Sequence, residues 1–220
     1  MIQGLVLTHG AIGEELVQNT IKSAGVRILG WSYSGFRRLS NSKRSITTPA
    51  DLKGLTIRVP KNAIMIDSYK SWGVSPTPMA WDEVFTALQQ KVLDGQDTPL
   101  ITQYVMKFYE VQKYITKIRY VFLLEPLVIS EQLFQRQSPE VQQVFMRAGK
   151  EAQEFCRQFL ILFEDSIETE LKGEGMQFLD PADNEKEWIE KATKEVWPKY
   201  YKSVGGKEKV DAALKAVGRM

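Results

Sequence analysis

The sequence has a single cysteine, Cys156, and a single histidine, His9. One cysteine excludes a disulfide within the chain, and the two residues together supply too few ligands for a Cys/His zinc site. A Cys–His nucleophilic pair would have to join Cys156 to His9, and neither residue has a neighbourhood that supports such a pair. Because Cys156 lies in a helical apolar pattern, we expect it to be a buried thiol.

Long apolar runs and a strong charge of one sign are also missing. No apolar run approaches the about 20 residues that a bilayer-spanning helix needs, and 29 basic against 27 acidic residues give a net charge of +2. Hydrophobic residues make up 43% of the 220 residues, which is too much for a globally disordered chain. Basic and aromatic residues do not interleave as in nucleic-acid-binding proteins, so we expect no nucleic-acid partner. We predict no metal site and no cofactor.

Helical and strand patterns alternate along the chain, which predicts an α/β protein. The longest helix is expected to begin after the cap Ser138, with Pro139 at its first position, and to continue to Gly173. It would be about 50 Å long, so we expect it to cross two lobes or to bend. Other helices are expected at 11–24, 63–72, 81–90, from the cap Asp183 toward 197, and at 207–217; strands are expected at 26–34, 55–59, 114–124 and 127–130, and a loop at 94–99.

Three arginines are candidate anion contacts. Arg58 ends a predicted strand just before a helix that Asn62 can cap, and in α/β sheets ligands bind beyond the carboxyl ends of strands. A guanidinium binds a carboxylate through two parallel hydrogen bonds, so Arg58 fits an anion site, although a salt bridge would fit the same position. Arg37 and Arg38 follow the first strand, where one of them could form a second contact and both could equally form a solvated basic face.

Two further features carry polar or aromatic side chains at predicted strand ends. Trp81 stands at a strand-to-helix junction, where its ring could cover a ligand or pack in the core. The predicted loop 94–99 contains Asp94 and Asp97, which could act as an acid pair in an enzyme. Polar ligand contacts from this loop are the favoured interpretation, because nothing in the sequence raises the pKa of either carboxyl group.

Several stretches resemble the solute receptors of tripartite ATP-independent periplasmic (TRAP) transporters. They are TPADLKGLTIRVP at 48–60, SPTPMAWDEVFTALQ at 75–89 continuing into DGQDTP at 94–99, and KFYEVQKY at 107–114. The resemblance implies a two-lobed α/β receptor, like a type II periplasmic binding protein, that closes on an organic acid and delivers it to the membrane permease subunits. It further implies a periplasmic protein that is not an enzyme.

The resemblance also implies roles for single residues. Arg58 matches the arginine that pairs with the substrate carboxylate, and Trp81 matches the aromatic residue over the ligand. Arg37 matches the second arginine best, and Arg38 is the alternative because the loop length differs by one. Asp97 and Thr98 stand in Gln-Asp-Thr-Pro where the family has Gln-Glu-Asn-Pro, so Thr98 replaces an amide with a hydroxyl. The predicted ligand-binding residues are Arg58, Arg37, Trp81, Asp97, Thr98, Asn62 and Arg38.

Compared with the family, the chain begins near the end of the first lobe. The expected division is 1–35 and 124–163 as the remnant of lobe I, with 36–123 and 164–220 as a complete lobe II. The first residues lack a signal-peptide pattern, which in a chain so shortened says nothing about localisation. We expect the apolar surfaces of the remnant to cause self-association. Two alternative functions are an oligomerising module without ligand transport and an acid/base enzyme that uses Asp94 and Asp97.

Overall fold

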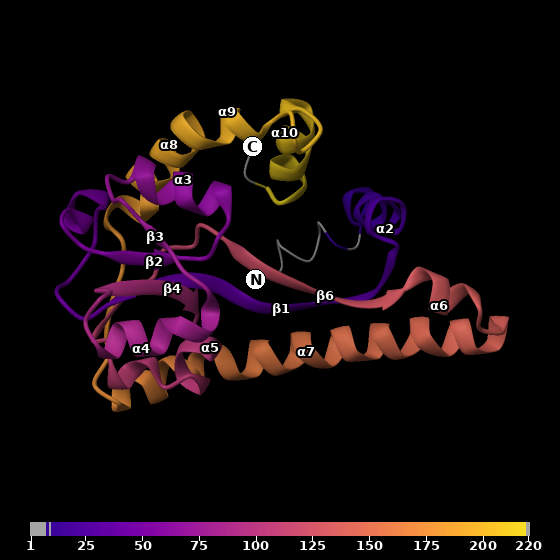
Figure 1. Cartoon of the computed structure of the whole chain (residues 1–220), viewed down its shortest axis with the longest axis horizontal. Coiled ribbons are helices and arrows are strands. Elements are labelled where there is room, and N and C mark those ends of the chain that lie inside the picture. The colour runs from indigo at the N-terminus through magenta and orange to yellow at the C-terminus, as the bar shows by residue number, and fades with distance from the viewer. Residues whose placement is uncertain (1–7, 9, 219–220) are drawn as a thin grey trace. The chain divides into compact units, whose positions relative to one another are not determined.

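The structure is a computed structural model that describes residue 8 and residues 10–218 (Figure 1). It confirms the predicted α/β class. The chain divides into two compact units: unit 1 comprises Met1–Gly35, Phe122–Phe163 and Glu208–Met220, and unit 2 comprises Phe36–Val121 and Glu164–Lys207. The sequence-based division instead places 208–220 with 164–207.

Helices and strands alternate through the described residues. The helices are α2 (Ala11–Ala24), α3 (Ala63–Ser71), α4 (Val84–Gln89), α5 (Leu100–Val105), α6 (Glu131–Gln135), α7 (Pro139–Gly173), α8 (Lys186–Lys191), α9 (Trp197–Tyr200) and α10 (Lys207–Ala216). The strands are β1 (Val26–Asn41), β2 (Ile57–Val59), β3 (Thr77–Pro78), β4 (Gly95–Pro99), β5 (Tyr114–Thr116), β6 (Phe122–Ser130) and β7 (Gln177–Leu179). Short 3-10 turns cover Pro49–Leu52, Trp81–Glu83, Phe108–Glu110 and Ala182–Glu185, and a π turn covers Ala192–Val196.

The elements with the strongest helical signals are confirmed. The helix α2 ends at Gly25, which adopts the left-handed conformation that glycine favours at this position. Asn62 caps α3, and its side chain accepts a hydrogen bond from the backbone N–H of Met65 at 3.2 Å. The long helix α7 runs from Pro139 to Gly173, as the apolar pattern predicts.

Five sequence predictions are wrong. The strand expected at 26–34 extends to Asn41 as β1, because its second half pairs with β4 and β5, so Arg37 and Arg38 lie within this strand rather than after it. The expected loop 94–99 forms strand β4, because β1 and β2 supply ladder partners that a polar sequence does not reveal. The expected strand 114–124 divides into β5 and the start of β6. The helix expected from Asp183 begins at Lys186, because the backbone of residues 183–185 is left-handed, with φ of 49°, 49° and 68°. Cys156 is half-buried rather than buried.

The core of unit 2 is a sheet with the strand order β3-β2-β4-β1-β5-β7. Strand β1 is antiparallel to both β4 and β5, whereas β2 is parallel to β3 and β4. One face packs against α3 and α8 through Leu39, Ile57, Val59, Tyr69, Trp72 and Trp188. On the other side, α4 packs with Phe108, and α5 and the end of α7 pack through Leu100, Ile115, Ile167 and Leu171.

The register between β1 and β4 decides which side chains share a face of this sheet. Leu39 stands opposite Asp97, and Arg38 stands opposite Thr98. Because successive side chains of a strand point to opposite faces, Arg37 shares the face of Leu39 and Asp97. Arg38 therefore lies on the opposite face, which α5 and α7 cover.

Unit 1 contains α2, α6 and parts of β1, α7 and α10, and β6 pairs with β1. Strand β1 approaches α7 closely at two glycines: a Cβ atom on Gly30 would lie 2.3 Å from the carbonyl oxygen of Gly149. The Arg27 guanidinium donates to both carboxylate oxygens of Glu131, at 2.8 and 2.7 Å. No helix among the described residues is long and apolar enough to cross a membrane.

Candidate functional site

A buried ion pair joins β1 to β4 in unit 2. The Arg37 guanidinium donates to both carboxylate oxygens of Asp97, with Nε–Oδ2 and Nη2–Oδ1 distances of 3.2 Å, and also to the Asp97 carbonyl oxygen. The Asp97 side chain is fully buried and the Arg37 side chain is 8% exposed. This double contact occupies Arg37 and cancels its charge within the protein.

Two tyrosines from other elements stand beside Asp97. The Tyr120 hydroxyl donates a hydrogen bond to Asp97 Oδ2. Tyr69 of α3 is fully buried and packs edge-on against Tyr120 with a centroid distance of 5.9 Å, and its hydroxyl has no hydrogen-bond partner among the described residues. Burial raises the pKa of the Tyr69 phenol, and the negative charge of Asp97 adds to this effect.

The pKa of Asp97 reflects two opposing causes. Burial raises the pKa of this carboxyl group above its ordinary value, while Arg37 and Arg58 act in the opposite direction. Arg58 therefore lies near enough for its charge to act on Asp97. Burial also lowers the pKa of the Arg58 guanidinium, and the charge of Asp97 partly offsets that effect.

Arg58 is buried but differs from Arg37 in its partners. Its Nε and Nη2 donate to the carbonyl oxygen of Met79, at 3.1 and 2.8 Å. Its guanidinium carbon lies 5.6 Å from the ring centroid of Trp81, a geometry that favours a cation–π contact. Within the described part of the chain, no carboxylate lies at ion-pair distance from Arg58. The two arginines and Asp97 thus leave an excess positive charge.

Trp81 lies between two neighbours and remains partly open to solvent. Its ring meets Phe108 edge-on, with centroids 5.8 Å apart, and 40% of the residue is exposed. The ring is therefore neither a core side chain nor an isolated surface side chain. It has a packed side and an open side, next to the guanidinium of Arg58.

Thr98 is buried on the face of the sheet opposite to Asp97, which is the face of Gln96 and of Arg58, the partner of Gln96 in the register. Its hydroxyl makes no hydrogen bond with any described residue, and neither does the Oε1 atom of the neighbouring Gln96. The Nε2 atom of Gln103 donates to the carbonyl oxygens of both Arg38 and Thr98, at 3.0 Å each. Buried hydroxyls usually have a partner, so Thr98 retains an unused hydrogen-bonding group.

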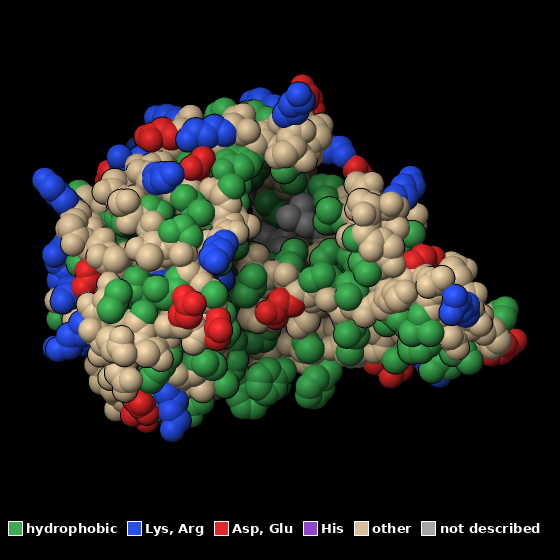
Figure 2. Space-filling model, in the orientation of Figure 1, with side chains coloured by type: hydrophobic (Ala, Val, Ile, Leu, Met, Phe, Trp, Pro, Cys, Tyr) green, Lys and Arg blue, Asp and Glu red, His purple; other side chains and the backbone are tan. Residues whose placement is uncertain are grey.

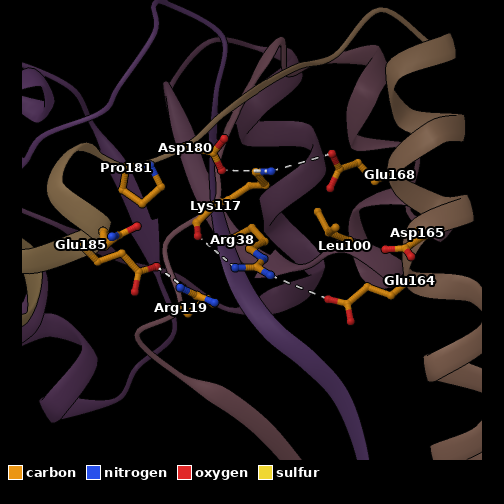
Figure 3. A pocket seen from close by; sticks show the side chains of 11 residues that line it. Arg38, Leu100, Lys117, Arg119, Glu164, Asp165, Glu168, Asp180, Pro181 and Glu185 are labelled. Atoms are coloured by element: carbon orange, nitrogen blue, oxygen red, sulfur yellow. Dashed lines mark hydrogen bonds and ion pairs between the residues drawn. The ribbon is translucent and has the colours of Figure 1, made fainter. Parts of the chain in front are cut away.

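Arg38 lies away from Arg37 and Asp97, in a pocket of about 290 Å³ (Figure 3). Its Nη1 donates to the carbonyl oxygens of Lys117 and Ile118, at 3.0 and 3.2 Å, and its Nη2 lies 3.7 Å from Glu164. Burial lowers the pKa of this guanidinium, and the charge of Glu164 opposes the effect. The pocket also contains the ion pair between Arg119 and Glu185.

The structure thus brings some of the predicted residues together and separates others. Arg37 and Asp97 are in contact, and Arg58 lies between Trp81 and the charge of Asp97. Asp94 has partners of its own, because it accepts from the Thr56 backbone N–H at 2.9 Å and pairs with Lys43 at 3.3 Å. The two aspartates therefore serve separate contacts rather than one acid pair.

Sequence reasoning missed the two tyrosines next to Asp97. Tyr120 follows the expected strand pattern, and Tyr69 lies on the apolar face of α3, so neither stands out by spacing. Tyr120 comes close to Asp97 because the backbone N–H of Arg37 donates to the carbonyl oxygen of the following residue, Val121, at 2.9 Å. Tyr69 comes close because α3 packs on the sheet face of Leu39. Both positions depend on tertiary contacts, which the spacing of residues in the sequence does not reveal.

Arg37, Arg58 and Asp97 thus form a polar cluster within the sheet, on strands β1, β2 and β4. The family "Bacterial extracellular solute-binding protein, family 7" matches residues 6–203, and the chain belongs to this family. It is 40% identical over 174 residues to a solute-binding protein of Roseobacter denitrificans, which covers 79% of this chain and 53% of the relative. It is 30% identical over 174 residues to the 2,3-diketo-L-gulonate-binding periplasmic protein of Escherichia coli, with the same coverage.

Solved structures agree with this assignment. A TRAP periplasmic solute-binding protein from a Polaromonas species, bound to D-erythronate, has a TM-score of 0.85 and 33% identity, covering 97% of this chain and 69% of that chain. The Roseobacter denitrificans protein, bound to L-galactonate, has a TM-score of 0.80 and 36% identity, covering 87% and 63%. The predicted receptor family and two-lobed class are therefore confirmed. These relatives are periplasmic binding proteins and not enzymes, as predicted. The chain spans about half the length of the curated relatives it matches.

Proposed function

We propose that this protein binds an organic acid through its carboxylate, as the solute receptor of a TRAP transporter, and delivers it to the membrane permease. The observation that supports the proposal is the positive charge of Arg58, which is unpaired within the described part of the chain. This buried guanidinium donates only to the Met79 carbonyl oxygen and faces no carboxylate among the described residues. A ligand carboxylate would supply the missing anion.

The pairing of Arg37 with Asp97 supports a specific division of roles. Because Asp97 already neutralises Arg37, the net positive charge of the cluster is one unit, which matches one ligand carboxylate. Arg37 can then hold Asp97 and Tyr120 in position while Arg58 meets the ligand. The charge of Arg37 acts on both Asp97 and Arg58, whereas Arg38 donates to the Lys117 and Ile118 carbonyl oxygens and lies 3.7 Å from Glu164. These contacts favour Arg37 over Arg38 as the second arginine of the proposed site.

The ligands of the relatives point to the same chemistry. L-Galactonate, D-erythronate and 2,3-diketo-L-gulonate each combine one carboxylate with several hydroxyl or carbonyl groups. For this chain we propose a hydroxylated carboxylic acid. Trp81 would cover its carbon chain, while Thr98 and the amide of Asn62 offer hydrogen-bonding groups for its oxygens. Unit 2 would be the ligand-holding lobe, and the described part of unit 1 would be a portion of the other lobe.

Calorimetric titration tests the proposal with a matched pair of ligands. Galactonate should release binding heat, whereas galactitol, which has the same hydroxyl pattern and no carboxylate, should not. Arg58→Lys keeps the charge but loses the two parallel donors, so its affinity for galactonate should fall by about 2–3 kcal/mol.

Arg147→Lys is the control, because Arg147 lies on an exposed part of α7, where its side chain is 70% exposed. This variant should bind like the parent protein. The same titrations with erythronate and diketogulonate cover the other proposed ligands. Equal binding of galactonate and galactitol, or an Arg58→Lys variant with the parent affinity for every acid that binds, would contradict the proposed carboxylate contact.

A further inference from the structure

The helix α7 carries two apolar faces in unit 1, and only one of them is packed. On the packed face, Gly149 touches the backbone of β1, Gln153 accepts a hydrogen bond from the Trp31 N–H at 2.8 Å, and Leu160 is buried. The second face recurs at three- and four-residue steps, so its members lie along one side of the helix. This apolar stripe of α7 consists of Val141, Val144, Ala148, Ala152, Phe155, Phe159 and Leu162, and every member is exposed.

The exposure of the stripe is large for a monomer. Leu162 is 73% exposed and Phe155 is 70% exposed, and Figure 2 shows hydrophobic side chains gathered along α7 at the lower edge of the view. Since a large aromatic side chain carries about 150–250 Å² of surface, the stripe presents on the order of 500 Å² of apolar area. Patches of about 300–600 Å² are the largest that ordinary monomers show, and they often mark interaction sites.

Side-chain size changes along the stripe in a way that matters for pairing. The large members Phe155, Phe159 and Leu162 occupy its C-terminal half, and the smaller alanines and valines occupy its N-terminal half. An antiparallel copy of the same helix would set the large half of each stripe against the small half of the other. Such a two-fold contact is self-complementary, because the same patch serves both partners.

We propose that the apolar stripe of α7 is the interface with a second copy of this chain. Large side chains of one copy pack over Ala148 and Ala152 of the other, which provide room for them, as ridges fit into grooves in packed helices. Pairing would bury roughly 1,000 Å² in total, close to the lower limit for specific interfaces. The dimer should therefore form at micromolar concentrations and dissociate on dilution.

Sedimentation velocity and light scattering of the 220-residue chain, between about 1 and 100 µM, test the proposal. The expected result is a shift from monomer to dimer mass with rising concentration. The double variant Phe155→Glu with Leu162→Glu should remain monomeric at 100 µM, because pairing would bury four carboxylates without partners against the small apolar residues of the facing stripes. The matched control is Val92→Glu with Val105→Glu, since these valines of unit 2 are 60% and 65% exposed. This control should dimerise like the parent.

Cross-linking provides a second measurement that does not depend on the folding of the glutamate variant. Ala152→Cys lies near the middle of the stripe, and in a Cys156→Ser background it should form a disulfide-linked dimer under mild oxidation. Val92→Cys in the same background should not. A monomer at every concentration, a dimer that survives the double glutamate substitution, or equal cross-linking of the two cysteine variants would overturn the proposal. A large aggregate shared by parent and glutamate variant would also overturn it.

Discussion

The guanidinium of Arg37 and the carboxylate of Asp97 meet in a two-point contact between adjacent strands, with two N–O distances of 3.2 Å. Neither group has appreciable access to water, since Asp97 is fully buried and Arg37 nearly so. Each charge therefore depends on the other, because an unpaired buried charge is strongly destabilising. This dependence makes the pair sensitive to the loss of either partner.

Removing Asp97 should lower stability more than removing any surface acid. Asp97→Ala leaves the Arg37 charge buried without a partner, so the free energy of unfolding should fall by about 3–5 kcal/mol. Asp97→Asn keeps one acceptor oxygen and should be less costly. Urea denaturation measures both variants. The control is Asp180→Ala, whose carboxylate is 83% exposed in its pair with Lys117, and which should lose no more than about 1 kcal/mol. A loss for Asp97→Ala that matches this control would contradict the interpretation.

The hydroxyl groups of Tyr120 and Tyr69 lie close to the same carboxylate, but they should contribute differently to the free energy of unfolding. Tyr120→Phe removes the hydrogen bond to Asp97, so stability should fall by about 1.5–3 kcal/mol, the range for bonds to charged groups. Tyr69→Phe removes a hydroxyl that has no partner among the described residues, so it should be neutral or stabilising. Each variant deletes the same atom from one of two neighbouring rings. Chemical denaturation of both variants therefore tests the expected order of their stabilities. The reverse order of stability would refute the assignment of the Asp97 hydrogen bond to Tyr120.

Trp81 should contribute more to ligand affinity than to stability. Its open side lies beside Arg58, so Trp81→Ala should weaken binding of an organic acid at least tenfold, as expected from the loss of an aromatic ligand contact. Phe85→Ala is the matched control, because Phe85 packs on the same Phe108 ring at 6.1 Å. Both variants should lose comparable melting temperature, and only Trp81→Ala should lose affinity. Titration of folded protein that shows unchanged affinity for Trp81→Ala would place this ring in the core instead.

Asp51 should make the free energy of unfolding depend on pH in the acidic range. Its carboxylate accepts hydrogen bonds from the backbone N–H groups of Thr47 and Thr48, at 2.9 and 2.8 Å, which hold its pKa below the ordinary value of 3.8. A carboxyl group with a lowered folded pKa contributes stability that is present above its unfolded pKa and is lost as the pH falls through the folded pKa. The parent should therefore lose more stability than Asp51→Asn between pH 5 and about pH 2.5. Denaturant titrations at several pH values measure this difference, and parallel pH profiles would rule it out.

The sequence predicts the helices of this fold better than its sheet. Capping and apolar spacing are local properties, so Asn62 and the Pro139–Gly173 helix could be placed from neighbouring residues alone. Strand β4 could not, because a polar segment such as Gln96-Asp97-Thr98 becomes a strand only through partners on both sides. The position of Asp97 between Arg37 and Tyr120 has the same cause, since these residues meet across strands distant in sequence.

The site residues also differ in whether the sequence alone could indicate them. Arg58 and Trp81 could be indicated because each stands at a recognisable junction between a strand and a helix. The choice between Arg37 and Arg38 could not be made locally, because adjacent residues in a strand differ only in the face they occupy. Their different environments arise from the register that sets Leu39 opposite Asp97. That register is a tertiary property, and it now gives the two arginines different partners.

Strand β1 contributes to both units, and each unit is completed by residues from later in the chain. Arg27 contacts Glu131 across 104 residues of sequence, and the Trp31 N–H reaches Gln153 across 122. During synthesis on the ribosome, β1 therefore emerges long before β6, which pairs with it, and α7, which packs against it in unit 1. The sheet of unit 2 is completed later still, because β7 can pair with β5 only after α7 has been made. Strand β1 therefore has to remain free of other strand partners while about a hundred further residues are made.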